Sequence, residues 1–264
     1  MREIPCHALQ DTALLDVQPE CYTDAKVSTR IGKAALLMQL LFRLPKLRRV
    51  DRERYSWAEI FKQAQQFANG FLNPLQVKSE AIRFLEAAEK LKPRYILEIG
   101  TAQGGNFFLL ARSAVRDATL ISLDLPGGPL GGGYSQWKTH VYRRLTLPGQ
   151  NSFFLRADSH APASLGEVKR ILKGNALDLL FIDGDHSYDG VKQDYLMYAP
   201  LVRRGGLIAF HDIIPNVVPE CTVDRFWNEL SQQVPVEEFV EDRNQGRMGI
   251  GVVRKNWGTD STDL

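Results

Sequence analysis

From residue 94 onward, short apolar segments alternate with longer segments in which apolar residues recur at helical spacing. The short segments are rich in Ile, Leu, Val and Phe, as buried strands are. This alternation is typical of βα units, in which helices cover a mostly parallel sheet. We therefore predict an α/β domain with seven strands, which are expected at 94–100, 119–125, 152–155, 176–185, 206–213, 236–242 and 246–255.

The longer segments predict helices, and the chain before residue 94 predicts helices alone. In the helix expected to follow the first strand, Phe107, Leu110 and Ala111 would form one apolar face. We divide the chain into an N-terminal helical extension, residues 1–74, and a second domain, residues 75–264. The extension is expected to act as a lid or a dimer contact. The helices are expected at 31–42, 56–71, 78–91, 106–115, 136–145, 188–202 (ending at a turn over 203–206) and 223–233.

Composition and charge exclude several classes of protein. With 264 residues, 44% of them apolar, the chain can bury a large core, and a net charge of +2 does not suit a nucleic-acid groove. Cys6, Cys21 and Cys221 are too far apart to indicate a disulfide framework or a metal knuckle. No apolar run is long enough to span a membrane, and the basic segment 46–54 has acidic neighbours that favour a solvated face. The first residues do not form a secretory signal, so we expect a cytoplasmic protein.

Glycine-rich and acidic residues follow the first two expected strands. Gly100 and Gly104 permit a tight turn and a close backbone approach, and the helix after them offers free N–H groups to an anion, although a closely packed turn alone would also explain them. Asp124 comes 24 residues after Gly100, a spacing that suits a carboxylate accepting hydrogen bonds from ribose hydroxyls. A nicotinamide enzyme would share this carboxylate, but its fingerprint is G-x-G-x-x-G, whereas here the glycines fall as G-x-x-x-G-G.

The ends of the fourth and fifth strands carry a second group of polar residues. Asp183 ends the fourth strand, while His211 and Asp212 end the fifth. Neighbouring parallel strands would bring these groups to one rim, where two carboxylates and a substrate oxygen suit Mg²⁺ and the imidazole also admits Mn²⁺, Fe²⁺ or Zn²⁺. The alternative is a solvated turn in which Asp185 caps the helix that starts near Ser187. The remaining histidines, His7, His140 and His160, are expected to be surface or packing residues.

Four motifs carry a resemblance to a known family: E-I-G-T-A-Q-G-G (98–105) with the strand-end Asp124, R-A-D-S (156–159), F-I-D-G-D-H-S-Y (181–188) and G-G-L-I-A-F-H-D (205–212). Over roughly residues 75 to 254 the chain resembles class I S-adenosylmethionine-dependent methyltransferases. Within them it is most similar to the cation-dependent small-molecule O-methyltransferases, including catechol, caffeoyl-coenzyme A and antibiotic-sugar methyltransferases and cephalosporin hydroxylase-like relatives. The resemblance implies a seven-stranded, mostly parallel Rossmann-like sheet with helices on both faces.

The resemblance also implies roles for single residues on the cofactor side. The turn with Gly100, Thr101 and Gly104 would receive the methionine end of S-adenosylmethionine. Glu98 would order this turn and contact the methionine amino group, and Asp124 would bind the ribose. Asp158 stands where the family recognises the adenine amino group, although it could instead cap a helix that begins near Ala161.

The same resemblance implies methyl transfer to a hydroxyl of a small molecule, a sugar or a secondary metabolite. A divalent cation, Mg²⁺ or Mn²⁺, would be held by Asp183, Asp212 and His211, the last standing where the family has an acidic residue. Either Asp185 or His186 would be the general base. The alternatives are a metal-independent methyltransferase with a His or Asp base, an NAD(P)-dependent oxidoreductase and a non-catalytic binding module. The loop 127–134, the segment 215–219 and the N-terminal helices are expected to line the acceptor pocket.

Overall fold

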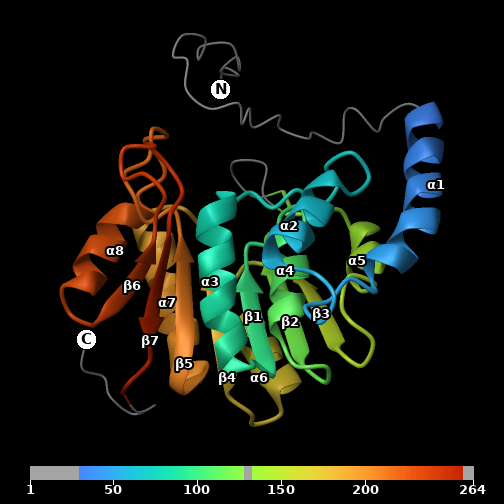
Figure 1. Ribbon diagram of the computed structural model, residues 1–264. Coiled ribbons are helices and arrows are strands. Elements are labelled where there is room, and N and C mark those ends of the chain that lie inside the picture. The colour runs from blue at the N-terminus through green and yellow to red at the C-terminus, as the bar shows by residue number, and fades with distance from the viewer. Residues whose placement is uncertain (1–29, 128–132, 258–264) are drawn as a thin grey trace.

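The computed structural model describes residues 30–127 and 133–257, and within them a seven-stranded sheet lies at the centre of the molecule (Figure 1). The strand order is β3-β2-β1-β4-β5-β7-β6. Strands β1 to β5 run parallel and β7 pairs antiparallel with both β5 and β6, so the predicted mostly parallel sheet of seven strands is confirmed. The strands are β1 (Tyr95–Ile99), β2 (Thr119–Asp124), β3 (Asn151–Arg156), β4 (Leu177–Ile182), β5 (Val202–His211), β6 (Val236–Phe239) and β7 (Ile250–Arg254).

Helices cover both faces of the sheet. Residues of α1 to α5 belong to one hydrophobic cluster, on the face of the sheet that α3 covers in the foreground of Figure 1, and residues of α6 to α8 belong to the cluster on the other face. The two clusters take alternate residues of each strand, for example Leu120 on one face and Ile121 on the other. The helices are α1 (Arg30–Leu47), α2 (Trp57–Gln66), α3 (Lys78–Leu91), α4 (Gly105–Ser113), α5 (Lys138–Tyr142), α6 (Pro162–Leu172), α7 (Tyr188–Tyr198), the 3₁₀-helix η3 (Ala199–Leu201) and α8 (Val223–Ser231).

The order of the strands reverses direction between β1 and β4, where open α/β sheets form a binding crevice. The chain builds β1, β2 and β3 outward in one direction and then returns to place β4 on the other side of β1. At such a reversal of strand order, the loops that follow the two central strands diverge, and ligands of open α/β sheets bind outside the carboxyl ends of the strands there. The segments after Ile99 and Ile182 are therefore the first place to look for a site.

The expected turn at 203–206 is wrong, because these residues belong to β5. Helix α7 already ends at Tyr198, and β5 begins at Val202 with a register irregularity opposite β4. The backbone N–H of Gly205 donates to Lys255 O, and Lys255 N donates to Gly206 O, so this stretch stays hydrogen-bonded to the residue that follows β7. Gly205 takes a left-handed φ of +80°, which absorbs the irregularity. The glycines thus mark a bulged strand.

Helix α4 is buried all round, whereas the sequence pattern predicts a single apolar face. All nine of its residues are buried, including Asn106 and Arg112. Helices α2 and α3 pack against α4, and the segment before α3 lies close to its start: a Cβ added to Gly105 would lie 2.5 Å from Leu72 O and from Pro74 N. The residues just before α3 therefore cover the first turn of α4, next to the glycine-rich turn.

The N-terminal helices share their core with the sheet. Leu44 and Trp57 belong to the same cluster as the residues of β1 and β2 on that face. The buried guanidinium of Arg112 donates hydrogen bonds to Leu47 O and Val50 O, which ties the end of α1 to α4. The division at residues 74 and 75 remains a prediction. Within the described ranges, no helix has the length and apolarity needed to cross a bilayer.

Candidate active site

The glycine-rich turn after β1 is pressed against the end of β4. Gly100 N donates to Leu123 O, and Asp183 N donates to Ile99 O, so the three strand ends are held together by their backbones. Gly100 has a φ of +85°, and a Cβ there would lie 1.8 Å from Asp183 O. No side chain fits at this position, because it would collide with backbone that the sheet holds in place.

The side chain of Glu98 stabilises this turn. Its side chain is fully buried and accepts hydrogen bonds from Thr101 Oγ1 (2.6 Å) and Asn106 Nδ2 (2.9 Å). Burial raises the pKa of Glu98 to about 8, and the two hydrogen bonds only partly oppose this. The carboxyl group thus connects the end of β1 to the glycine-rich turn and to the first turn of α4. That geometry agrees with the expected role in ordering the turn, while the contact with a methionine amino group remains a prediction.

The carboxylate of Asp124, at the end of β2, also stabilises this turn. Its Oδ2 atom accepts hydrogen bonds from the backbone N–H groups of Thr101 (2.9 Å) and Ala102 (2.7 Å). Burial raises the pKa of Asp124 to about 6, against the lowering effect of these bonds. The spacing from Gly100 indicates the ribose as a partner but does not reveal this second function. The ribose contact itself remains a prediction.

Asp158, the residue expected near adenine, is exposed and lies in the turn between β3 and α6. Its Oδ1 atom accepts a hydrogen bond from His160 N (2.8 Å). The N-cap of α6 is Ala161, which makes no side-chain capping bond, so the interpretation of Asp158 as the cap is wrong. The reason is that an Asp three residues before the cap folds back on its own turn. His160 in turn approaches the buried Asp194, with Nε2 and Oδ1 3.4 Å apart, and is a packing residue as expected.

Asp183, His211 and Asp212 converge at the ends of β4 and β5. One ligand atom from each lies within 4.8 Å of the other two. His211 Nδ1 is 3.0 Å from Asp183 Oδ1 and 3.8 Å from Asp212 Oδ2. His211 and Asp212 are buried and Asp183 is partly buried. The predicted meeting of these three side chains is therefore confirmed, and what they bind is a separate question.

Distant segments complete the surroundings of this cluster. Gln76, just before α3, donates a hydrogen bond of 3.4 Å from Nε2 to Asp183 Oδ2. Met248, just before β7, donates from its backbone N to Asp212 Oδ1 (2.9 Å). Asp212 has a left-handed φ of +60°, which an Asp tolerates better than most residues. Neither Gln76 nor Met248 belongs to a recognisable motif, so sequence reasoning missed both.

The carboxylates and imidazoles of this cluster shift one another's pKa values. Burial acts to lower the pKa of His211, but the carboxylates of Asp183 and Asp212 outweigh it and raise that pKa. The same competition raises the pKa of His186, whose Nδ1 lies 2.9 Å from Asp212 Oδ2. Burial acts to raise the pKa of Asp212, and the two imidazoles lower it below its usual range. The surroundings thus favour the protonated form of both imidazoles, and a divalent cation held by this cluster would take the place of those protons.

The donor set fits a divalent cation. Two carboxylates and an imidazole are ligands that Mg²⁺ and, better, Mn²⁺ accept. The imidazole of His211 turns Nδ1 toward both carboxylates, so a nitrogen and two carboxylate groups face the same position. On these observations the residues present fit the cation that the resemblance implies.

The two expected bases differ in their surroundings. His186 belongs to the cluster, with Nε2 4.0 Å from Asp183 Oδ1. Asp185 is exposed and its Oδ1 accepts a hydrogen bond from Ser187 N (2.9 Å). The N-cap of α7 is Ser187, whose Oγ accepts from Gly190 N, so the alternative in which Asp185 caps this helix is wrong. Asp185 instead stabilises the turn that precedes the cap.

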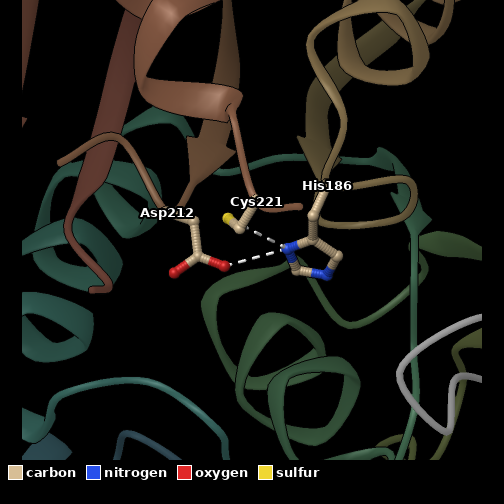
Figure 2. A group of neighbouring side chains, drawn as sticks. All are labelled: His186, Asp212 and Cys221. Atoms are coloured by element: carbon tan, nitrogen blue, oxygen red, sulfur yellow. Dashed lines mark hydrogen bonds and ion pairs between the residues drawn. The ribbon is translucent and has the colours of Figure 1, made fainter. Parts of the chain in front are cut away.

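Cys221 is a further residue that sequence reasoning missed. Its buried Sγ lies 4.0 Å from His186 Nδ1, so it joins Asp212 around that imidazole (Figure 2). Nothing in its sequence spacing marks it, because it follows a loop of irregular structure after β5. Cys6, Cys21 and His7 lie outside the described residues, as do residues 128–132 of the expected acceptor loop.

The chain has similarities to known proteins in both sequence and fold. Residues 97–213 match the family described as a methyltransferase domain. The O-methyltransferase TomG from Streptomyces achromogenes, solved with S-adenosylmethionine, superposes with a TM-score of 0.54 and 17% identity over 77% of this chain and 91% of that chain. The O-methyltransferase from Bacillus cereus, solved with S-adenosylhomocysteine, gives a TM-score of 0.54 and 19% identity over 80% of this chain and 96% of that chain. At these identities the structural likeness establishes the fold.

Two curated relatives match part of the sequence. An uncharacterized protein of Acanthamoeba polyphaga mimivirus is 31% identical over 130 residues, 47% of this chain and 55% of the relative. An uncharacterized protein of Sinorhizobium fredii is 25% identical over 166 residues, 61% of this chain and 18% of the relative. The chain therefore spans about half the length of the first relative and a smaller part of the second. Residues 97–213 are therefore similar to a methyltransferase domain, in agreement with the predicted resemblance, and the described part of the chain has the fold of the two O-methyltransferase structures.

Proposed function

We propose that this protein transfers a methyl group from S-adenosylmethionine to a hydroxyl oxygen of a small molecule, with a divalent cation held by Asp183, His211 and Asp212. The observation that carries this proposal is the convergence of those three side chains directly beside the glycine-rich turn after β1. Asp183 belongs to both parts, because its backbone contacts Gly100 and its side chain contacts His211. A methyl donor and an acceptor oxygen would therefore lie next to each other.

On the cofactor side, the proposal assigns the methionine end to the turn of Gly100, Thr101 and Gly104. Helix α4 starts there, and its free N–H groups and positive dipole end favour a carboxylate. Asp124 would accept hydrogen bonds from the ribose and Asp158 would contact the adenine amino group. Bound in this way, S-adenosylmethionine supplies an electrophilic methyl carbon. Glu98 and Asp124 keep the turn in the conformation that binding requires.

On the acceptor side, the residues of the cluster would position the hydroxyl and receive its proton. Asp183 and Asp212 would hold the cation, which would supply Lewis-acid chemistry that lowers the pKa of the acceptor hydroxyl. The geometry favours His186 over Asp185 as proton acceptor, because His186 lies in the cluster while the Asp185 carboxylate is bound to the turn before α7. A cation bound at Asp183 and Asp212 would lower the pKa of His186 and so favour its neutral imidazole, the form that accepts a proton.

Calorimetric titration with S-adenosylmethionine tests the first part. We expect saturable binding to the wild type, and a folded sample that binds nothing at about 1 mM cofactor would end the proposal. For the second part, we expect a chelator to abolish methyl transfer and Mg²⁺ or Mn²⁺ to restore it. Asp183→Asn should lose methyl transfer and keep cofactor binding. Full turnover in chelator would instead favour a metal-independent reaction with His186 as base.

A further inference from the structure

We propose that His186, Asp212 and Cys221 form a second metal site, selective for Zn²⁺ and similarly thiophilic divalent ions, beside the oxygen-rich cluster of Asp183, His211 and Asp212. Figure 2 shows the three side chains facing one another from three different loops. The Nδ1 atom of His186 lies 2.9 Å from Asp212 Oδ2 and 4.0 Å from Cys221 Sγ. All three ligand atoms lie within 4.8 Å of one another.

These separations suit a tetrahedral ion. Zinc bonds of about 2.0 to 2.3 Å place the ligand atoms of a tetrahedron roughly 3.3 to 3.6 Å apart. The nitrogen-to-oxygen distance must lengthen and the nitrogen-to-sulfur distance must shorten, each by a few tenths of an ångström. Rotations of the side chains of His186 and Cys221 are the movements that would adjust these two distances.

The backbone around the three ligands is held in place by hydrogen bonds that do not use the ligand atoms. Thr222 N donates to His186 O (2.8 Å), and Thr222 Oγ1 accepts from Tyr188 N (2.7 Å), so the loop with Cys221 is joined to the loop with His186 on both sides. Asp212 Oδ1 accepts from Met248 N, which orients Oδ2 toward the imidazole. Such contacts behind the ligands are what orients ligands in known metal sites.

The donor atoms determine which ion binds. A thiolate, an imidazole and one carboxylate oxygen form a ligand set for zinc, and three protein ligands leave a fourth position for water or another group. Mg²⁺ prefers oxygen ligands alone and is disfavoured beside the sulfur. The chain thus presents two neighbouring donor sets that differ in the ion they prefer and share one carboxylate, Asp212.

The shared residues predict a functional consequence, which rests on the proposed function. Zinc bound at His186 Nδ1 would prevent this imidazole from accepting a proton and would draw Asp212 away from the oxygen-rich cluster. Zinc is therefore expected to inhibit methyl transfer that Mg²⁺ or Mn²⁺ supports. The zinc site itself does not depend on catalysis and can be tested on protein with no known acceptor.

The test uses Co²⁺ as a spectroscopic substitute for Zn²⁺ in full-length protein in which Cys6 and Cys21 are replaced by serine, so that Cys221 is the one remaining thiol. We expect one Co²⁺ per chain with a thiolate-to-cobalt charge-transfer absorption that Zn²⁺ abolishes by displacement. Cys221→Ser and Cys221→Ala in this background should lose the absorption and bind Zn²⁺ at least about tenfold more weakly. Asp183→Asn, which removes no ligand of the proposed zinc site, should keep the absorption.

A second measurement needs no variant at Cys221. X-ray absorption of the zinc-loaded serine background should show a zinc-to-sulfur distance of about 2.3 Å. No sulfur in the zinc shell, or a charge-transfer band that survives both Cys221 substitutions, would overturn the inference. A failure of the proposed function looks different: S-adenosylmethionine would not bind, while the cobalt titration would be unchanged. If methyl transfer is found, Cys221→Ser should raise the zinc concentration that halves the rate.

Discussion

The Oδ2 atom of Asp124 lies 2.9 Å from the backbone nitrogen of Thr101, so the carboxylate at the end of β2 holds the turn that follows β1. The same oxygen binds the nitrogen of Ala102 at 2.7 Å. One side chain therefore both shapes the turn and faces the place assigned to the ribose. A substitution at Asp124 should therefore weaken cofactor binding in two ways, because it removes the hydrogen bonds that shape the turn and the carboxylate assigned to the ribose.

We expect Asp124→Ala to weaken S-adenosylmethionine binding by about ten- to a hundredfold, because hydrogen bonds to a charged group contribute roughly 1.5 to 3 kcal/mol. Calorimetric titration measures this effect. Asp117→Ala, an exposed aspartate before the opposite end of β2, is the matched control and should bind normally. Equal affinity of the Asp124 variant and the wild type would contradict the assignment of Asp124.

Gly100→Ala should be far more harmful than Gly174→Ala. Both glycines have nearly the same left-handed φ, +85° and +84°, so both substitutions cost about 1 to 2 kcal/mol of conformational strain. An added Cβ at Gly174 meets open space, whereas at Gly100 it meets Asp183 O at 1.8 Å. Urea unfolding should show a loss above about 4 kcal/mol, or no folded protein, for Gly100→Ala alone. Similar losses for the two variants would show that the strand ends yield more easily than the sheet implies.

The contact of His160 with Asp194 should make stability depend on pH. The hydrogen bond with Asp194 raises the pKa of His160 to about 8, above its usual 6.5, although burial opposes this. A raised pKa means that the native state binds the proton more tightly, so the contribution is complete below about pH 6.5 and is lost as the pH rises through about 8. Asp194 is fully buried, and its two oxygens have no other hydrogen-bond partner among the described residues.

We therefore expect the stability difference between wild type and His160→Gln to shrink between pH 6.5 and 8.5, as measured by urea unfolding at fixed ionic strength. His140→Gln, at an exposed histidine, serves as the control. A difference that stays constant over this range would mean that the ion pair does not form in solution.

Glu80→Ala should loosen the segment that leads into β7. The buried carboxylate of Glu80 accepts hydrogen bonds from Glu241 N (2.9 Å), Gln245 Nε2 (2.8 Å) and Gly249 N (3.0 Å). Its removal leaves three donors without this acceptor and should cost about 2 to 4 kcal/mol of stability. Hydrogen exchange should accelerate across residues 241–249, which include the Met248 nitrogen that binds Asp212. Glu86→Ala, at an exposed position of the same helix, should leave that exchange unchanged.

Most of the fold could be predicted because its signals are local. Strand β4 ends in a continuous apolar run from Leu179 to Ile182, and the change from Ile182 to Asp183 marks the strand end in the sequence itself. The errors occurred where tertiary contacts override local preference. Gly205 and Gly206 indicate a turn by themselves, yet pairing with the neighbouring backbone keeps them in β5. Helix α4 is buried on all sides because α2 and α3 pack against it and the segment before α3 covers its first turn.

The sequence by itself determined which polar residues stand at strand ends, including Asp124, Asp183 and Asp212, because strand boundaries follow from neighbouring residues. Only the tertiary structure decided the partners of each carboxylate. Asp124 binds the turn of another strand, and Asp212 lies between two imidazoles and near Cys221, a residue without any motif. Those partners depend on strand order and on loop paths, which are set by the packing of the whole chain and leave no periodic signal in the sequence.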